Sequence, residues 1–182
     1  MFNKMQSLTG RAPRESQMPA RLRSVEQLMP FPTAAELLAA KALKGVIAAA
    51  PESSVLAAMQ TMADRHIGFL PVIAEGVVLG VVSERDCVRK AVLRQLPAAD
   101  TPVSAIMSTP VHSVAPEAKV PECITLMHEK GVRHVPVMAG GEMLGVLSVR
   151  DLLAALVHRH ERLLRRFEEE RLTLLYPDPS SY

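Results

Sequence analysis

The chain has 182 residues, 48% hydrophobic and 22% charged, with a net charge of +2, which is the balance of a soluble globular protein with one compact domain or two small ones. Aromatic residues make up only 3% and Trp is absent, so neither the charge nor the composition favours a nucleic-acid partner. No apolar run reaches the ~18–20 residues of a membrane span, and no membrane partner is expected.

Residues 1–31 combine three prolines with scattered arginines and show little periodicity, which predicts a flexible N-terminal arm. The arm lacks the apolar stretch of a secretory signal, so a cytoplasmic location is expected. Its basic residues leave an organellar transit peptide as the alternative. The two cysteines, Cys87 and Cys123, have no metal-like spacing and are expected to be buried thiols. The histidines show no paired ligand spacing, so no metal site is predicted.

The segment Thr33-Ala34-Ala35-Glu36 has the form of a capping box and predicts the start of a helix. The run rich in Ala and Leu carries this helix to Leu43, and Gly45 is placed to end it.

From Val46 onward the chain repeats itself with a constant shift of 65 residues, as from Pro51 to Pro116. Each unit reads as strand, helix, two strands joined by a tight turn, and helix, or β-α-β-β-α. One such unit cannot bury both faces of its three-stranded sheet. The fold class is therefore α/β (α+β), with two repeats packed sheet to sheet in pseudo-two-fold symmetry. The expected elements are 46–50, 53–65, 69–73 and 79–82, then 111–115, 119–130, 134–138 and 144–147, with a short helix at 103–107.

A long C-terminal helix follows the second repeat, because an apolar stripe with a helical period continues from Leu153 to Leu175. The stripe is either cover for the same chain or a dimer contact, and the dimer is favoured. The predicted organisation is an arm at 1–31, repeat 1 at 32–95, repeat 2 at 96–160 and a helical extension with a tail at 161–182.

Both units end in the same turn, Gly-Val-x-Ser-x-Arg-Asp, at Gly80–Asp86 and at Gly145–Asp151. A strand that runs into a helix N-terminus presents unpaired N–H groups, which suit an anion. The Ser hydroxyl can donate and the Asp carboxylate can accept, so a phosphate and a ribose diol would satisfy the turn together. The alternative is that Asp86 and Asp151 merely cap the following helices.

The duplicated unit, with Leu-Pro-Val in the second strand of repeat 1 and this turn before the last helix, resembles the CBS domain. The resemblance covers about residues 33–160 and looks like the tandem pair called a Bateman module. It implies binding of an adenosyl compound between the repeats: AMP, ADP or ATP first, NAD or S-adenosylmethionine next, with no required cofactor. The residues it implies are Ser83 and Ser148 for phosphate, Asp86 and Asp151 for ribose, the backbone of Gly45-Val46 and Thr109-Pro110-Val111 beside adenine, and Arg85 and Arg150 as further contacts.

The two repeats differ just before the second strand. Repeat 2 has Arg133-His134 there, where similar modules direct cations at phosphate, whereas repeat 1 has Gly68-Phe69. We expect the Asp86 cleft to face Arg133 and His134 and the Asp151 cleft to face an uncharged wall. One site would then depend more on phosphate than the other. The alternative is that Arg133 and His134 are ordinary solvated surface.

The sequence thus predicts a regulatory, signal-transducing homodimer that senses an adenine nucleotide, as a measure of energy or redox state, and acts on an unknown protein target. It is not expected to be an enzyme, because no nucleophile–base pair, phosphate-binding Walker loop or metal cluster is recognisable. Two alternatives stay open: a regulatory subunit of a separate enzyme or transporter, and a structural dimer with empty clefts.

Overall fold

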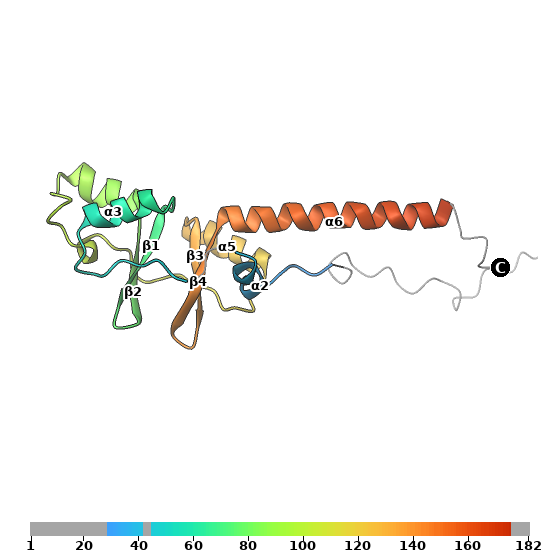
Figure 1. Cartoon of the computed structure of the whole chain (residues 1–182), viewed down its shortest axis with the longest axis horizontal. Helices are drawn as coiled ribbons and strands as arrows, with labels where there is room; N and C mark the ends of the chain where they lie inside the picture. Colours follow the sequence, from blue (N-terminus) through green and yellow to red (C-terminus); the bar gives the residue numbers. More distant parts are fainter. Residues whose placement is uncertain (1–28, 42–44, 176–182) are drawn as a thin grey trace, which may run out of the picture. The chain divides into compact units, whose positions relative to one another are not determined.

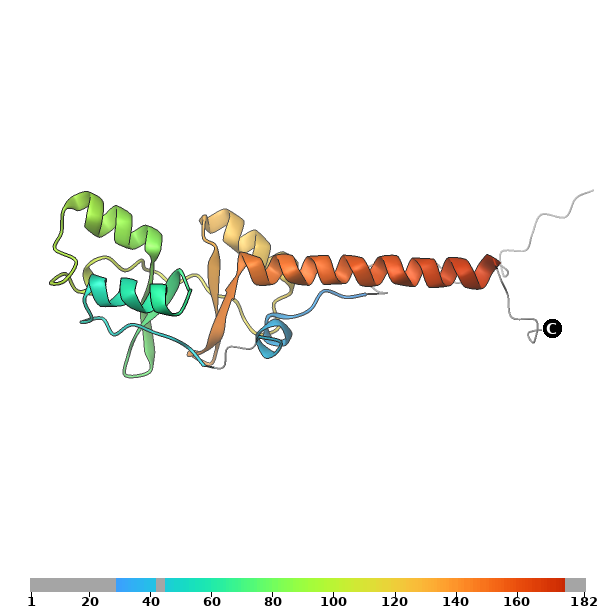
Figure 2. The same ribbon diagram turned by 45° about the horizontal axis from the view of Figure 1, so that its top comes forward.

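The computed structural model describes residues 29–41 and 45–175; nearly all of the predicted arm lies outside these ranges. The duplicated α+β architecture is confirmed, and the hairpins of the two repeats stand next to each other in both views (Figures 1 and 2). None of the described helices is long and apolar enough to cross a membrane. The elements are α2 (Ala34–Ala39), α3 (Val55–Asp64), β1 (Phe69–Ala74), β2 (Val77–Ser83), α4 (Glu84–Asp86) continued by a π turn (Cys87–Ala91) and a 3-10 turn (Val92–Arg94), a 3-10 turn (Val103–Ala105), α5 (Val120–Lys130), β3 (His134–Ala139), β4 (Glu142–Ser148) and α6 (Val149–Leu175).

The 65-residue repeat holds at the level of strand register. Strand β1 pairs antiparallel with β2 from Phe69 opposite Ser83, and β3 pairs with β4 from His134 opposite Ser148. Both hairpins shift register at the same point, after Val72 and after Val137. The strand-to-helix turns at Ser83 and Ser148 therefore have equivalent backbone positions in the two hairpins.

The predicted third strand of each sheet is only a single parallel bridge, Ala49 with Val72 in repeat 1. The Ala49 N–H donates to Pro71 O at 2.9 Å, and Ala49 O accepts from the Ile73 N–H at 3.0 Å. To extend this bridge into a parallel ladder, the next hydrogen bond toward the N-terminus would need the N–H of Pro71, and the next one toward the C-terminus would need the N–H of Pro51. Proline has no N–H, so the pairing stops at one bridge. Repeat 2 has the same limit. Val114 is hydrogen-bonded to Pro136 O and to the Met138 N–H, and the prolines at 136 and 116 cannot extend the ladder.

The repeats exchange the segments that precede them. Helix α2, which leads into repeat 1, packs on repeat 2: the Ala34 N–H donates to Ala118 O at 2.8 Å, and Ala34 is buried in the second core. Conversely, Val103 and Ile106, which lead into repeat 2, are buried in the first core. Each core is thus completed by chain from before the other repeat, and the cores do not follow the sequence boundary predicted at 95/96.

Helix α2 begins at the predicted capping box, where the Thr33 N–H donates to Glu36 Oε2 at 2.7 Å, but it is shorter than expected. It ends at Ala39 rather than Leu43, which lies outside the described residues. The Ala40 N–H still donates to Glu36 O at 3.1 Å and the Lys41 N–H donates to Leu38 O at 3.1 Å, and the Lys41 ammonium donates to Val146 O of repeat 2 at 3.0 Å. The predicted extent of this helix was therefore wrong.

The glycine of each repeated turn makes room for the exchanged segment. A Cβ at Gly145 would lie 2.8 Å from Leu38 Cδ2 of α2. A Cβ at Gly80 would lie 2.7 Å from Met107 Sδ and 3.2 Å from the backbone oxygen of Ser108. A larger residue at either glycine position would push away the segment that leads into the other repeat.

We expect Gly145→Ala to lower the free energy of unfolding by about 1–3 kcal/mol, the usual cost of overpacking. Shortening the neighbour should relieve the clash, so the double variant Gly145→Ala/Leu38→Ala should lose less than the sum of the two single losses. Urea unfolding of the four proteins measures the coupling. Strictly additive losses would show that Gly145 does not serve to seat α2.

Candidate functional site

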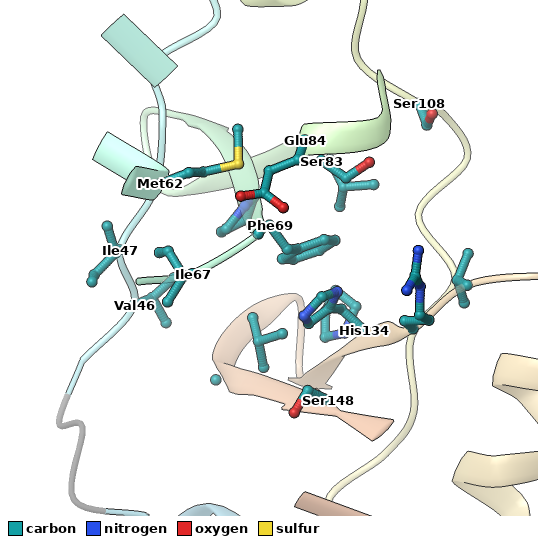
Figure 3. A pocket seen from close by; sticks show the side chains of 18 of the residues that line it. Val46, Ile47, Met62, Ile67, Phe69, Ser83, Glu84, Ser108, His134 and Ser148 are labelled. Atoms are coloured by element: carbon teal, nitrogen blue, oxygen red, sulfur yellow. The ribbon is translucent and has the colours of Figure 1, made fainter. Parts of the chain in front are cut away.

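A cavity of about 850 Å³ is lined by both repeats, at the ends of β2 and β4 and the starts of β1 and β3 (Figure 3). Its lining carries more positive than negative charge: Lys41, Arg85, Lys130, Arg133 and Arg150 against Glu84 and Asp86. Apolar side chains of Val46, Ile47, Met62 and Ile67 gather along one side. The cavity therefore offers an apolar wall and a cationic surface to one ligand.

The structure brings nearly all the predicted site residues to this cavity. Eleven of the thirteen line it; Val111 and Asp151 are not among the lining residues, although Lys41, which holds Asp151, is. The eleven are Gly45, Val46, Ser83, Arg85, Asp86, Thr109, Pro110, Arg133, His134, Ser148 and Arg150.

The Ser and Asp of each turn form a capping box. Ser83 Oγ donates to Asp86 Oδ2 at 2.5 Å and accepts from the Asp86 N–H at 3.2 Å, while the Ser83 N–H donates to Asp86 Oδ2 at 3.0 Å. Ser148 and Asp151 repeat the pattern, with the Ser148 N–H 2.6 Å and its Oγ 2.7 Å from Asp151 Oδ2. The Ser is the cap and the Asp is the third residue of the helix. The Ser-x-x-Asp spacing, equivalent to Thr33-x-x-Glu36, already carried this signal.

Two lysines that sequence reasoning missed hold the carboxylates. Lys90 Nζ lies 3.0 Å from Asp86 Oδ1 and donates to Ser108 Oγ at 2.7 Å, and Ser108 Oγ donates to the same carboxylate oxygen at 3.1 Å. Lys41 Nζ lies 2.9 Å from Asp151 Oδ2. The four-residue spacing from Asp86 to Lys90 is a detectable helix pairing. Lys41 is 110 residues from Asp151 and gives no such signal.

These contacts keep both carboxylates ionised. Burial by itself raises the pKa of Asp86, but hydrogen bonds from Ser83, Lys90 and Ser108 and the Lys90 charge outweigh it and lower the pKa below its ordinary value. For Asp151, burial is likewise outweighed by the bonds from Lys41 and Ser148, and its pKa is also lowered.

The residues predicted on opposite walls meet in the centre: the rings of Phe69 and His134 stack with centroids 5.2 Å apart (Figure 3). Burial, then the charges of Lys41 and Arg133, lower the pKa of His134, against an opposing effect of Asp151. The division into a charged and an uncharged wall stays a prediction.

The predicted buried thiols are confirmed, since Cys87 and Cys123 have no exposed surface. Burial raises the pKa of both thiols, which keeps them protonated. In the part of the chain that the structure describes, no group of three or more His, Cys, Asp or Glu side chains is placed to hold a metal ion.

Comparison with known proteins gives the cavity its context. The sequence profile of the CBS domain matches residues 34–92 and 103–158. The chain belongs to the CBS-domain family. The two matched stretches correspond to the two repeats, so the chain contains a tandem CBS pair, as the resemblance implied.

Relatives of this CBS pair come from plants, bacteria and archaea. The "CBS domain-containing protein CBSX3, mitochondrial" of Arabidopsis thaliana is 32% identical over 120 residues, which is 63% of this chain and 58% of that protein. A solved structure of a protein with CBS domains from Burkholderia ambifaria is 34% identical, with a TM-score of 0.67, covering 69% of this chain and 94% of that one. The CBS pair of protein MJ0100, solved with 5'-methylthioadenosine and S-adenosylmethionine, is 20% identical with a TM-score of 0.63 over 71% of this chain and 99% of that one, which shows a shared fold.

The lowered pKa values of Asp86 and Asp151 predict acid sensitivity. A carboxyl with a lowered folded-state pKa contributes stability that is present above its unfolded pKa of about 3.9 and is lost as the pH falls through the folded pKa. We expect the free energy of unfolding to fall below about pH 4, and to fall less steeply in the Asp86→Asn/Asp151→Asn variant. Urea unfolding at several pH values measures both slopes. Asp64→Asn, at an exposed position outside the cavity, should keep the wild-type slope; equal slopes in all three proteins would contradict the assignment.

Proposed function

We propose that this CBS pair is a regulatory module that binds an adenine nucleotide in the cavity between its repeats. The observation that carries the proposal is the convergence of two Ser-x-x-Asp turns on one cavity with an excess of positive charge. The complex of MJ0100 with two adenosyl compounds supports a ligand of this class for the fold. AMP, ADP and ATP fit better than an uncharged adenosyl compound, because the lining cations need anionic partners.

The parts of such a ligand find matching groups. The carboxylate of Asp86 in the lining, and that of Asp151 behind the lining residue Lys41, are suited to accept from a ribose diol, and the guanidinium groups of Arg85, Arg133 and Arg150 are suited to phosphate. The apolar side of the cavity, at Val46 and Ile47, offers an adenine ring a surface without charge. The residues present therefore fit an adenine nucleotide without a metal or a catalytic group, and we propose binding rather than catalysis.

Two other roles would use the same fold: a regulatory subunit of a separate enzyme or transporter, and a structural dimer. Co-purification of a second protein would favour the subunit. The cytoplasmic location stays a prediction, and the mitochondrial designation of the Arabidopsis relative supports the organellar alternative.

Ligand binding is tested by the melting temperature with adenosine, AMP and ATP. A ligand at about a hundredfold its Kd stabilises the native state by about 2.7 kcal/mol, which raises the melting temperature by several degrees. We expect Asp86→Ala and Asp151→Ala each to reduce the rise, whereas Asp64→Ala should keep it. If wild type shows no rise with any of the three at millimolar concentration, the structural dimer is the better description.

We also propose that the module is a homodimer joined through α6. The helix carries two apolar stripes: Leu152 and Leu163 are buried, whereas Leu153, Val157, Leu164 and Phe167 are 50–58% exposed. With exposed His160, the second stripe is spaced 4-3-4-3, the a/d pattern of a coiled coil. The exposed arginines of this region, Arg162, Arg165 and Arg166, all lie off the stripe. A second copy of the same helix would cover it.

The dimer is tested by light scattering of Leu164→Glu, which buries a charge in the proposed contact and should yield monomer. Leu172→Glu is the matched control, because Leu172 is as exposed as Leu164, at 51%, but lies off the stripe. We expect the control to remain dimeric. Monomeric wild type at tens of micromolar, or equal weakening by both substitutions, would contradict a dimer through α6.

A further inference from the structure

The two carboxylates assigned to ribose already hold a cation each, and they hold it in different ways. We propose that Lys90 and Lys41 are specificity-determining residues: Lys90 makes the Asp86 half of the cavity require a phosphate-bearing ligand, whereas Lys41 leaves the Asp151 half open to a nucleoside. The inference rests on the proposed nucleotide function and adds the residues that set its selectivity.

At Asp86 both carboxylate oxygens are taken. Oδ2 accepts from the N–H and the hydroxyl of Ser83, and Oδ1 accepts from Lys90 and from Ser108. Lys90 Nζ also donates to Ile106 O at 2.9 Å, so the ammonium is fixed by three acceptors in a half-buried place. A ribose diol can reach this carboxylate only by displacing Lys90 or Ser108.

The chemistry of the incoming ligand decides whether that displacement is favourable. A nucleoside replaces a charged donor by neutral hydroxyls and leaves the ammonium without its anion. A nucleotide brings a phosphate, which gives the displaced ammonium a new anionic partner and a charge-assisted hydrogen bond. Lys90 therefore penalises adenosine at this half far more than AMP.

At Asp151 the contacts fall on one oxygen. The Ser148 N–H, the Ser148 hydroxyl and Lys41 all meet Oδ2, and Oδ1 receives no hydrogen bond from the described residues. A ribose hydroxyl can therefore donate to Oδ1 while Lys41 stays in place. The Asp151 half should accept adenosine and AMP with similar affinity.

The experiment is calorimetry of adenosine and AMP in the Asp151→Ala background, which leaves the Asp86 half to report. We expect AMP to bind at least tenfold more tightly than adenosine there. Adding Lys90→Met should lower the Kd of adenosine roughly three- to tenfold, because adenosine then no longer has to break a contact worth one ordinary hydrogen bond. The ratio of the adenosine Kd to the AMP Kd should become smaller as a result. Arg89→Met is the matched control: neither Lys90 nor Arg89 lines the cavity, but Lys90 contacts Asp86 whereas Arg89 is an exposed cation without that contact, so this variant should leave the ratio unchanged.

If Lys90→Met does not fold, Lys90→Gln removes the charge but keeps a donor for Asp86, and the same narrowing is expected. In the Asp86→Ala background, the two ligands should differ by less than threefold. An unchanged ratio with the Lys90 variants, or weaker binding of both ligands in equal measure, would overturn the specificity role while leaving nucleotide binding intact. Failure of every protein to bind either ligand would overturn the nucleotide function itself, and the specificity role with it.

Discussion

Two half-buried carboxylates, Asp86 and Asp151, connect each strand-to-helix turn to the segment that precedes the other repeat. Asp86 joins the end of β2 through Ser83, the following helix through Lys90 and the segment leading into repeat 2 through Ser108. Asp151 joins the end of β4 through Ser148 and the segment after α2 through Lys41. Each carboxylate thus fixes a strand-to-helix turn and attaches chain from before the other repeat, and each stays charged because its donors outweigh the cost of burial.

The proposed nucleotide would need the same carboxylates for its ribose. Structural contacts and ligand contacts would then compete for the same oxygens, and a ligand would change the protein in proportion to its advantage over the internal donors. Such a competition would give a physical route from binding to a change in the protein: a ligand that takes over Asp151 Oδ2 would loosen the contact with Lys41 in the segment after α2, whereas one that uses Oδ1 would not. At Asp86 the contact at risk is with Ser108 and Lys90.

Local patterns were sufficient to predict much of this architecture. The repeat period, the helix stripes and the turn glycines gave the two hairpins and their helices, and Thr33 with Glu36 gave the start of α2. The third strands are shorter than strand propensity predicts, because Pro51 and Pro71 lack the N–H groups that a longer ladder needs. The role of Lys41 could not be predicted, because it depends on contacts with residues more than a hundred positions away. The exchange of leading segments has the same cause: it is a tertiary choice that periodicity does not record.

The lysines also show how a duplicated backbone acquires unequal sites. Applying the 65-residue shift, the counterpart of Lys90 is Ala155, which packs on the second core, and the counterpart of Lys41 is Ile106, which is buried in the first. Neither lysine has a lysine counterpart at the equivalent position, yet each carboxylate is paired with one cation. One comes from the next turn of the same helix and the other from the exchanged segment. A half-buried carboxylate needs a compensating charge wherever it can be found. Because the two charges arrive from different directions, they block different oxygens, and two turns with the same backbone present different acceptors to a ligand.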